Sequence, residues 1–398
     1  MKILVTDGNT RPALAICRSL GQNGHEVIVA DKRPSNLASR SRYCQQRCVY
    51  PDPVKHPETF ISFLLEYVQV NRIDALLPVT DVTTIPLTEN AQLFEQYCRI
   101  PFAGPEAIKR AADKVDIMAL AESLDIDIPR SVRIDAADSL KQEQIEFDFP
   151  VVIKPAHSRI KTETGWIYTS VSYAKDFKDL KKQLKALDPR TFPLLIQERI
   201  IGPGLGIFLL FQNGSPVTAF SHRRIREKPP SGGVSVLRES TALDPLAFQA
   251  SVKLLEALNW NGVAMVEFKI DERDSRPKLM EINGRFWGSL QLAIDAGVDF
   301  PGLLIRSINE KLPTDYDYTL GVKSRWLWGD IDALLARLLK NNQALQLPPE
   351  SPGKFKYLLD FLRLWQPKTK YEVERLSDLR PWLFETGQWI KQMIGRSA

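Results

Sequence analysis

Two carboxylates and an amide about two thirds of the way along the chain have the types and spacing of a metal site. Two runs of β-forming residues flank a polar turn there, which predicts an antiparallel hairpin. In the simplest register Glu267 lies directly opposite Glu281, and Asn283 shares their face of the sheet. The same register sets Lys269 against Leu279.

Opposed carboxylates on neighbouring strands repel each other, and a divalent cation between them would remove that repulsion. Carboxylate and amide oxygens are hard ligands that suit Mg²⁺, or Mn²⁺, held together with phosphate groups. Glu267, Glu281 and Asn283 are therefore candidate metal ligands. Arg285 follows them as a fixed cation for developing negative charge, which makes it the candidate catalytic residue. The alternative is a solvent-facing polar stripe in which Lys269 neutralises the acidic pair.

A second charged cluster occupies residues 221–233, where cationic side chains precede a Gly-Gly turn. If the segment is a strand, alternation places His222, Arg224 and Arg226 on one face. Arg223 then lies on the other face. The alternative is a solvated cationic loop, the usual meaning of a charge run.

The elements that precede these clusters begin with alternating strands and helices in residues 1–104, which predicts a parallel, Rossmann-like sheet. A helix is expected from Pro12 to Asn23. The loop after the first strand has one glycine, Gly8, whereas a dinucleotide fingerprint needs three, so a nicotinamide-dependent enzyme is the weaker alternative. The predicted strands are Lys2–Thr6, Glu26–Asp31, Asp74–Val79 and Arg99–Ala103.

From Pro105 onward the pattern changes to a mixture of helices and short strands. One helix is predicted from Ala107 to Leu124, and a lysine-rich helix lies between strands Pro150–Lys154 and Leu194–Glu198. The expected fold class is thus α/β followed by α+β. The predicted domains are 1–104, 105–312, and an aromatic, basic C-terminal extension, 313–398.

Glu267 followed by Glu281-x-Asn283-x-Arg285 resembles the metal-binding signature of the ATP-grasp superfamily. That superfamily includes carboxylate–amine and carboxylate–thiol ligases, biotin carboxylase and the carbamoyl-phosphate synthase large subunit. The resemblance implies that the acidic pair and Asn283 bind Mg²⁺ at the ATP phosphates and that Arg285 lies against an acyl phosphate. It covers roughly residues 1–310 and implies a small lobe near 115–198 and a large lobe near 199–312.

Two lysines match the phosphate-binding positions of that superfamily. Lys154 ends the segment Val-Val-Ile-Lys, and Lys114 lies upstream of it, so the resemblance implies that both contact ATP phosphates. The superfamily usually has a glycine-rich loop after Lys154, whereas residues 156–169 contain only Gly165. Donors there would have to be side chains such as those of Ser158, Arg159 and Lys161.

The segment between the two lobes is similar to the one that holds adenine. The resemblance implies side-chain binding by Glu198 and main-chain contacts from Arg199 and Ile201. It also places the cationic segment near the acceptor substrate, so Arg224 and Arg226 become candidate ligands of a substrate carboxylate or the γ-phosphate.

The implied function is an ATP- and Mg²⁺-dependent ligase that joins a small carboxylate to a small amine through an acyl phosphate. No side-chain nucleophile is needed for this route, which agrees with the lack of a Ser-His or Cys-His arrangement. A noncatalytic ATP-binding protein with a regulatory or scaffolding role is the alternative.

The net charge of +5 is too small to predict nucleic-acid binding, but it is unevenly distributed. Residues 323–398 contain 13 Lys and Arg against 8 Asp and Glu, which accounts for the whole surplus. A terminal helix there is expected to pack onto its own domain or onto a partner subunit, which includes a second copy, and contact with a membrane surface is the alternative. Five tryptophans lie in this segment: Trp326, Trp328, Trp365, Trp382 and Trp389. The expected apolar stripe comprises Trp382, Leu383, Trp389, Ile390, Met393 and Ile394, beside Lys391 and Arg396.

The four cysteines match no disulfide framework or zinc motif. The N-terminal sequence lacks the apolar region of a secretory signal. The sequence therefore predicts a cytoplasmic protein, peripheral to a membrane if the terminal helix binds one.

Overall fold

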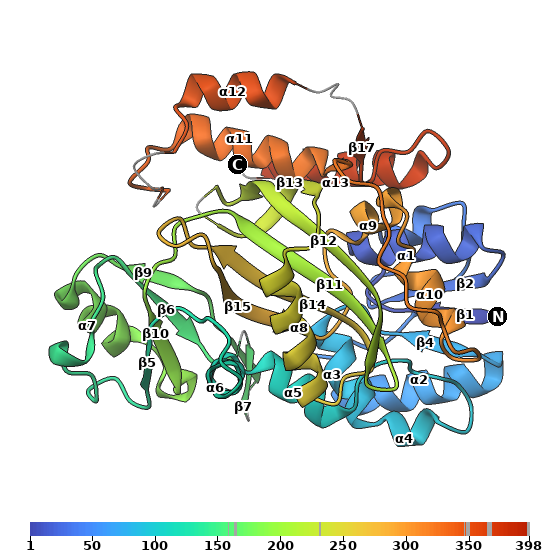
Figure 1. Cartoon of the computed structure of the whole chain (residues 1–398). Coiled ribbons are helices and arrows are strands. Elements are labelled where there is room, and N and C mark those ends of the chain that lie inside the picture. The colour runs from blue at the N-terminus through green and yellow to red at the C-terminus, as the bar shows by residue number, and fades with distance from the viewer. Residues whose placement is uncertain are drawn as a thin grey trace.

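The computed structural model describes residues 1–157, 159–162, 165–230, 232–345, 347, 351–363 and 368–395. An N-terminal parallel α/β sheet is followed by antiparallel sheets and then by the helices of the C-terminal extension (Figure 1). Ser158, Trp365 and Arg396, which entered the sequence predictions, lie outside the described residues.

The N-terminal sheet is parallel, as predicted, and has the strand order β3-β2-β1-β4. Arg99–Ala103, predicted as a strand, contributes only an isolated bridge from Arg99 to Ala75, whereas the unpredicted β3 forms the sheet edge. The strands are β1 (Lys2–Val5), β2 (Glu26–Asp31), β3 (Cys44–Val49) and β4 (Ala75–Leu77). The helices are α1 (Arg11–Gln22), η1 (Ala38–Arg40), α2 (Pro57–Asn71), α3 (Asp81–Glu89) and α4 (Ala91–Phe94).

The single helix predicted from Ala107 to Leu124 is two helices, α5 (Pro105–Ala112) and α6 (Lys114–Ser123). Asp113 interrupts them because its backbone is extended and its carboxylate accepts hydrogen bonds from two backbone amides of α6. An aspartate in this position is a strong N-cap. The break makes Lys114 the first residue of α6 and directs that helix toward the β15 strand.

The small lobe is a four-stranded sheet in the order β5-β10-β6-β9, with the separate hairpin β7–β8 beside it. The strands are β5 (Ser131–Ile134), β6 (Val151–Pro155), β7 (Arg159–Thr162), β8 (Gly165–Tyr168), β9 (Ser172–Ala174) and β10 (Leu194–Gln197). The helices are η2 (Gln142–Gln144), α7 (Phe177–Ala186) and η3 (Pro189–Thr191). The segment after Lys154 is thus a β-hairpin in its described part.

The large lobe is a seven-stranded sheet in the order β15-β14-β11-β12-β13-β16-β17. One face packs against α9, α10 and the N-terminal domain, and the other packs against α5, α6 and α8. The strands are β11 (Gly204–Gln212), β12 (Ser215–Lys228), β13 (Val234–Ser240), β14 (Gly262–Ile270), β15 (Pro277–Asn283), β16 (Lys323–Arg325) and β17 (Thr369–Tyr371). The helices are α8 (Pro245–Ala257), α9 (Leu290–Ala296) and α10 (Phe300–Arg306).

The C-terminal extension packs against the rest of the protein, and Figure 1 shows α11 and α12 along one edge of the molecule. Its helices are α11 (Leu327–Leu339), α12 (Lys354–Leu362) and α13 (Arg380–Gly395). Buried ion pairs join it to α1, because Glu372 pairs with Arg11 and Asp378 lies 2.9 Å from Arg18. The terminal region is therefore an integral part of the fold.

Glu374→Gln is expected to stabilise the protein above neutral pH. Both carboxylate oxygens of Glu374 are buried with no hydrogen-bond partner among the described residues, and burial raises the pKa of this carboxyl from 4.5 to about 7. Between pH 4.5 and about 7 the folded state keeps a proton on Glu374 that the unfolded state has lost. The free energy of unfolding therefore falls as the pH rises through about 7. Removing the charge should add ~1–3 kcal/mol above that pH.

Urea unfolding at mildly acidic and mildly alkaline pH measures this effect. Glu66→Gln, at an exposed position on α2, is the matched control and should leave the pH dependence unchanged. The same slope in the wild type and in Glu374→Gln would show that Glu374 is not the titrating group.

Candidate functional site

The predicted pairing of the two carboxylates is confirmed, because Glu267 of β14 lies opposite Glu281 of β15. The predicted partner of Lys269 is wrong: the register shifts by one residue beyond this pair, and Lys269 faces Lys278. Met280 is the extra residue that creates the bulge. A bulge of this kind re-aims neighbouring side chains and commonly lies beside functional sites.

Asn283 joins the two acidic side chains. Its amide nitrogen lies 3.2 Å from an oxygen of Glu281 and 3.4 Å from an oxygen of Glu267. Its amide oxygen accepts a 3.0 Å hydrogen bond from Arg285. A cation between the carboxylates would require the opposite amide orientation, which a side-chain rotation supplies.

Cationic groups from both lobes converge on these carboxylates. Arg224 of β12 forms an ion pair with Glu267, and the Lys114 ammonium lies 3.5 Å from Glu281. The Lys154 ammonium reaches the same strand and lies 3.8 Å from the sulfur of Met280. The structure thus brings both predicted phosphate lysines to the predicted metal ligands.

Burial and the neighbouring charges shift the pKa values of the two carboxylates in opposite directions. Burial raises the pKa of Glu267, and the nearby Glu281 adds to this rise against the opposing effect of Arg224. Burial acts on Glu281 in the same sense, but Lys114, Asn283 and Lys154 outweigh it and lower its pKa. Burial also lowers the pKa of Lys154 to about 8. Two acidic groups with divergent pKa values in one cluster are typical of a functional site.

The residues fit a hard divalent cation that also takes ligands from a phosphate substrate. Among the described residues no three His, Cys, Asp or Glu side chains form a metal-binding group, so the protein offers two carboxylates and one amide. Mg²⁺ commonly binds through one or two carboxylates while phosphates and waters complete its coordination.

Arg285 links the site to the N-terminal domain. Its guanidinium lies 2.9 Å from the carboxylate of Asp81, the first residue of α3. Sequence reasoning missed Asp81, whose only signal was a Thr-Asp pair after a predicted strand. The N-terminal sheet therefore contributes directly to the position of the candidate catalytic arginine.

The segment between the lobes places Glu198, Arg199 and Ile201 next to one another beyond β10. The carboxylate of Glu198 accepts hydrogen bonds from Arg130 and Arg273, neither of which the sequence singled out. Arg199 lies over the ring of Tyr173 at 5.0 Å. Ile201 is partly exposed, and its carbonyl accepts a hydrogen bond from the amide of residue 272.

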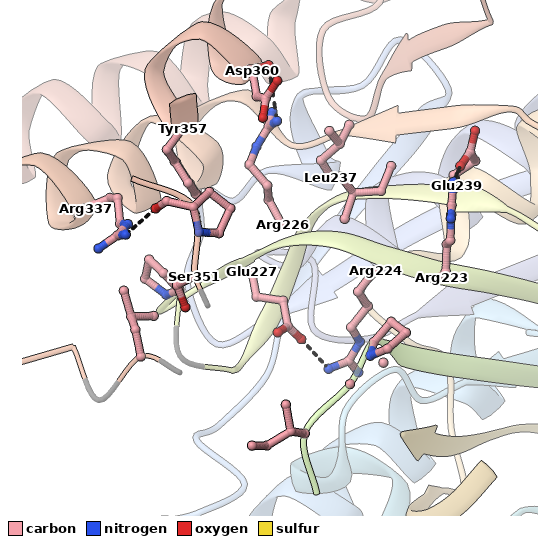
Figure 2. A pocket seen from close by; sticks show the side chains of 18 of the residues that line it. Arg223, Arg224, Arg226, Glu227, Leu237, Glu239, Arg337, Ser351, Tyr357 and Asp360 are labelled. Atoms are coloured by element: carbon pink, nitrogen blue, oxygen red, sulfur yellow. Dashed lines mark hydrogen bonds and ion pairs between the residues drawn. The ribbon is translucent and has the colours of Figure 1, made fainter. Parts of the chain in front are cut away.

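The prediction that Arg224 and Arg226 share a face is wrong. Arg224 pairs with Arg238 but Arg226 pairs with Leu237, because Ile225 is an extra residue in β12. Figure 2 shows the side chains of Arg224 and Arg226 pointing in opposite directions. Arg226 is held by Asp330 of α11 at 2.5 Å.

A cavity of about 780 Å³ lies between this part of the sheet and the C-terminal extension (Figure 2). Residues 201–204, which follow the interlobe segment, form one of its walls. Arg224 lines the cavity and also contacts Glu267, so the cavity adjoins the carboxylate cluster. Its charged lining residues are Arg223, Arg224, Arg226, Glu227, Glu239, Glu272, Lys323, Arg337, Asp360 and Arg363.

Comparison with known proteins agrees with this geometry. Residues 190–327 match a protein family described as "ATP-grasp in the biosynthetic pathway with Ter operon". The chain is 22% identical over 294 residues to the N-terminal section of the carbamoyl phosphate synthase large chain of Methanopyrus kandleri. That alignment covers 70% of this chain and 50% of the relative, and the chain spans half or less of the length of the first curated relatives it matches.

Three solved structures share the fold. N5-carboxyaminoimidazole synthetase from Staphylococcus aureus superposes with a TM-score of 0.65 at 15% identity, covering 86% of each chain. Biotin carboxylase from Campylobacter jejuni gives 0.61 at 17% identity, covering 81% of this chain and 74% of that one. L-amino acid ligase from Bacillus licheniformis gives 0.59 at 16% identity, with 78% and 75% covered. Residues 190–327 are thus similar to an ATP-grasp family, and the chain as a whole has the fold of these three enzymes.

Proposed function

We propose that this protein is an ATP- and Mg²⁺-dependent ligase that joins a carboxylate to an amine through an acyl phosphate. The observation that carries the proposal is the approach of Lys114 and Lys154 to the opposed pair Glu267 and Glu281. Acidic ligands for a metal and basic ligands for phosphates thus lie within one cluster. The similarity to an L-amino acid ligase supports an amine as the second substrate.

Glu267, Glu281 and Asn283 would hold the metal, which when bound supplies charge neutralisation at the phosphates. Lys114 and Lys154 would neutralise phosphate oxygens from the small-lobe side. The peptide groups of residues 199–201 and the side chain of Glu198 would bind the adenine. Because phosphoryl transfer depends chiefly on positioning and charge, these contacts are sufficient without a protein nucleophile.

In the first step the substrate carboxylate attacks the γ-phosphorus, and the bond to ADP breaks. In the second step the amine attacks the acyl carbon, phosphate leaves and the nitrogen loses a proton. Arg285, anchored by Asp81, would stabilise the negative charge that develops in both steps. We place the carboxylate and the amine in the cavity beside Arg224, whose guanidinium would meet the carboxylate once the metal occupies Glu267.

The test is a screen of carboxylate and amine pairs for Mg²⁺-dependent ADP release, followed by isotope transfer. An acyl phosphate requires one ¹⁸O atom of a labelled carboxylate to appear in the released phosphate. ADP release without this transfer would contradict the acyl-phosphate route. Binding of Mg-ATP with no turnover for any pair would instead favour the noncatalytic alternative, and thermal stabilisation by NAD(H) alone would favour the nicotinamide one.

A further inference from the structure

Helix α12 presents an apolar stripe to solvent. Phe355, Leu359 and Leu362 are 46–74% exposed and are spaced so that they lie on one side of the helix. The opposite side carries Phe361, which is buried, and Tyr357, which faces the cavity. The helix thus packs through one face and leaves a second apolar face that no described residue covers.

Helix α13 has the same organisation. The predicted single stripe divides in two: Trp389 stacks on Trp328 of α11 at 4.3 Å, whereas the aliphatic residues point away from the protein. Leu383, Ile390 and Ile394 are 45–67% exposed and share one side of the helix. The inner face is therefore covered by α11 and by the N-terminal domain, whereas no described residue covers the outer face.

The charged residues that are exposed around these two stripes have one sign in the described part of the chain. Among the described residues from 338 to 395, every charged residue classed as exposed is basic. The acidic residues of the same part are buried or half-buried, and they are Asp360, Glu372, Glu374, Asp378 and Glu385. The exposed basic residues are Lys340, Lys354, Lys356, Arg363, Lys368, Lys370, Arg380 and Lys391.

We propose that α12 and α13 form a peripheral binding surface for an anionic lipid membrane, with the aliphatic and Phe355 side chains inserted between headgroups. Exposed apolar residues bordered by lysine and arginine are the composition of interfacial helices. A second copy of the chain fits poorly, because two such faces would set basic residues against basic residues. No helix of the described residues is long and apolar enough to cross the bilayer, so the contact is superficial.

Helix α7 of the small lobe provides an internal comparison. It exposes four lysines, Lys178, Lys181, Lys182 and Lys185, but its leucines, Leu180 and Leu184, are buried. This helix has the charge of an interfacial helix without its apolar stripe. If charge alone held the protein on a membrane, α7 would contribute as much as α12.

Sedimentation of the full-length protein with vesicles tests the proposal. Vesicles of phosphatidylcholine and phosphatidylglycerol in equal parts should pellet the protein, and vesicles of phosphatidylcholine alone should pellet much less. The triple variant Leu383→Gln, Ile390→Gln, Ile394→Gln should lower the partition coefficient roughly tenfold or more. Lys354→Gln with Lys356→Gln should lower it roughly tenfold, since each lysine near an anionic surface contributes separately.

Matched controls sit elsewhere on the molecule. Val70→Gln removes an apolar side chain of α2 that is 74% exposed, more than any of the three α13 residues. Lys181→Gln with Lys182→Gln removes two charges from α7. Both variants should bind like the wild type. Circular dichroism and urea unfolding check that all variants fold.

Three outcomes would overturn the proposal. One is equal pelleting on the two vesicle types, and a second is equal losses in the α7 and α12 variants. The third is a dimer in sedimentation velocity that the α13 substitutions convert to a monomer, which would assign the surface to a second copy.

Discussion

Glu281→Gln is expected to lower Mg²⁺-dependent ATP turnover on the order of 10²- to 10³-fold, the largest functional effect of any single substitution in this protein. Glu281 faces Glu267 across the strands and lies 3.5 Å from Lys114, so it touches both the acidic and the basic half of the cluster. Glutamine keeps the shape of the side chain. The loss would therefore report the missing charge.

The binding measurement separates this effect from a loss of substrate contacts. Calorimetry should show weaker binding of Mg-ATP by Glu281→Gln and a smaller difference between ATP with and without Mg²⁺. Glu310→Gln is the control, because Glu310 pairs with Arg306 on the surface and lies neither in the carboxylate cluster nor in the cavity wall. If the binding of ATP depends on Mg²⁺ in Glu281→Gln as it does in the wild type, Glu267 and Glu281 are not the metal ligands.

The pH dependence gives an independent readout of the same substitution. Burial and the charge of Glu281 both raise the pKa of Glu267, so the metal-free site retains a proton at Glu267 to a higher pH than an ordinary glutamate. Binding of a divalent cation must release that proton, and affinity for Mg-ATP should rise as pH increases through this pKa. In Glu281→Gln the repulsion between the two carboxylates is lost, so the pKa of Glu267 falls. The rise of Mg-ATP affinity with pH should then occur at a lower pH than in the wild type.

The site was predictable from the sequence as far as strand periodicity determines it. The alternation of side chains along β14 and β15 placed Glu267 opposite Glu281, and the superfamily resemblance supplied Lys114 and Lys154. Both errors of register arose at bulges, at Met280 and in β12. A bulge is a response to packing by distant elements, which local residue types do not encode.

The bulge at Ile225 shows how an inserted residue changes the partner of the side chain that follows it. Because Ile225 is inserted into β12, Arg226 turns to the face that the C-terminal extension covers. Its partner there, Asp330, lies about a hundred residues further along the chain. Likewise, the basic surplus of the extension was visible in the composition, but the sequence could not show which acids are buried against Arg11, Arg18 and Arg226.

This buried pairing leads to the largest expected effect on stability: Asp330→Asn should lower the free energy of unfolding by ~3–5 kcal/mol. Asp330 is completely buried and lies 2.5 Å from Arg226 and 2.7 Å from Arg325, both also buried. Asparagine is nearly isosteric but carries no charge. Two guanidinium groups would then remain in the interior without their shared counter-ion.

Urea unfolding provides the measurement, with Asp135→Asn as the matched control. Asp135 pairs with Arg133 on the surface, where both side chains are more than half exposed, and its loss should change stability by less than about 1 kcal/mol. A similar small change for Asp330→Asn would mean that water or other groups stabilise the two arginines.

A compensating variant distinguishes a missing charge from a general disturbance of packing. Replacing all three partners by apolar residues, Arg226→Met, Arg325→Met and Asp330→Leu, removes the uncompensated cations along with the acid. Buried ion pairs often contribute little compared with well-packed apolar side chains, so the triple variant should recover most of the stability lost by Asp330→Asn alone. Because Arg226 also lines the cavity, a triple variant that is stable but has altered substrate turnover would show that this arginine serves the site as well as the fold.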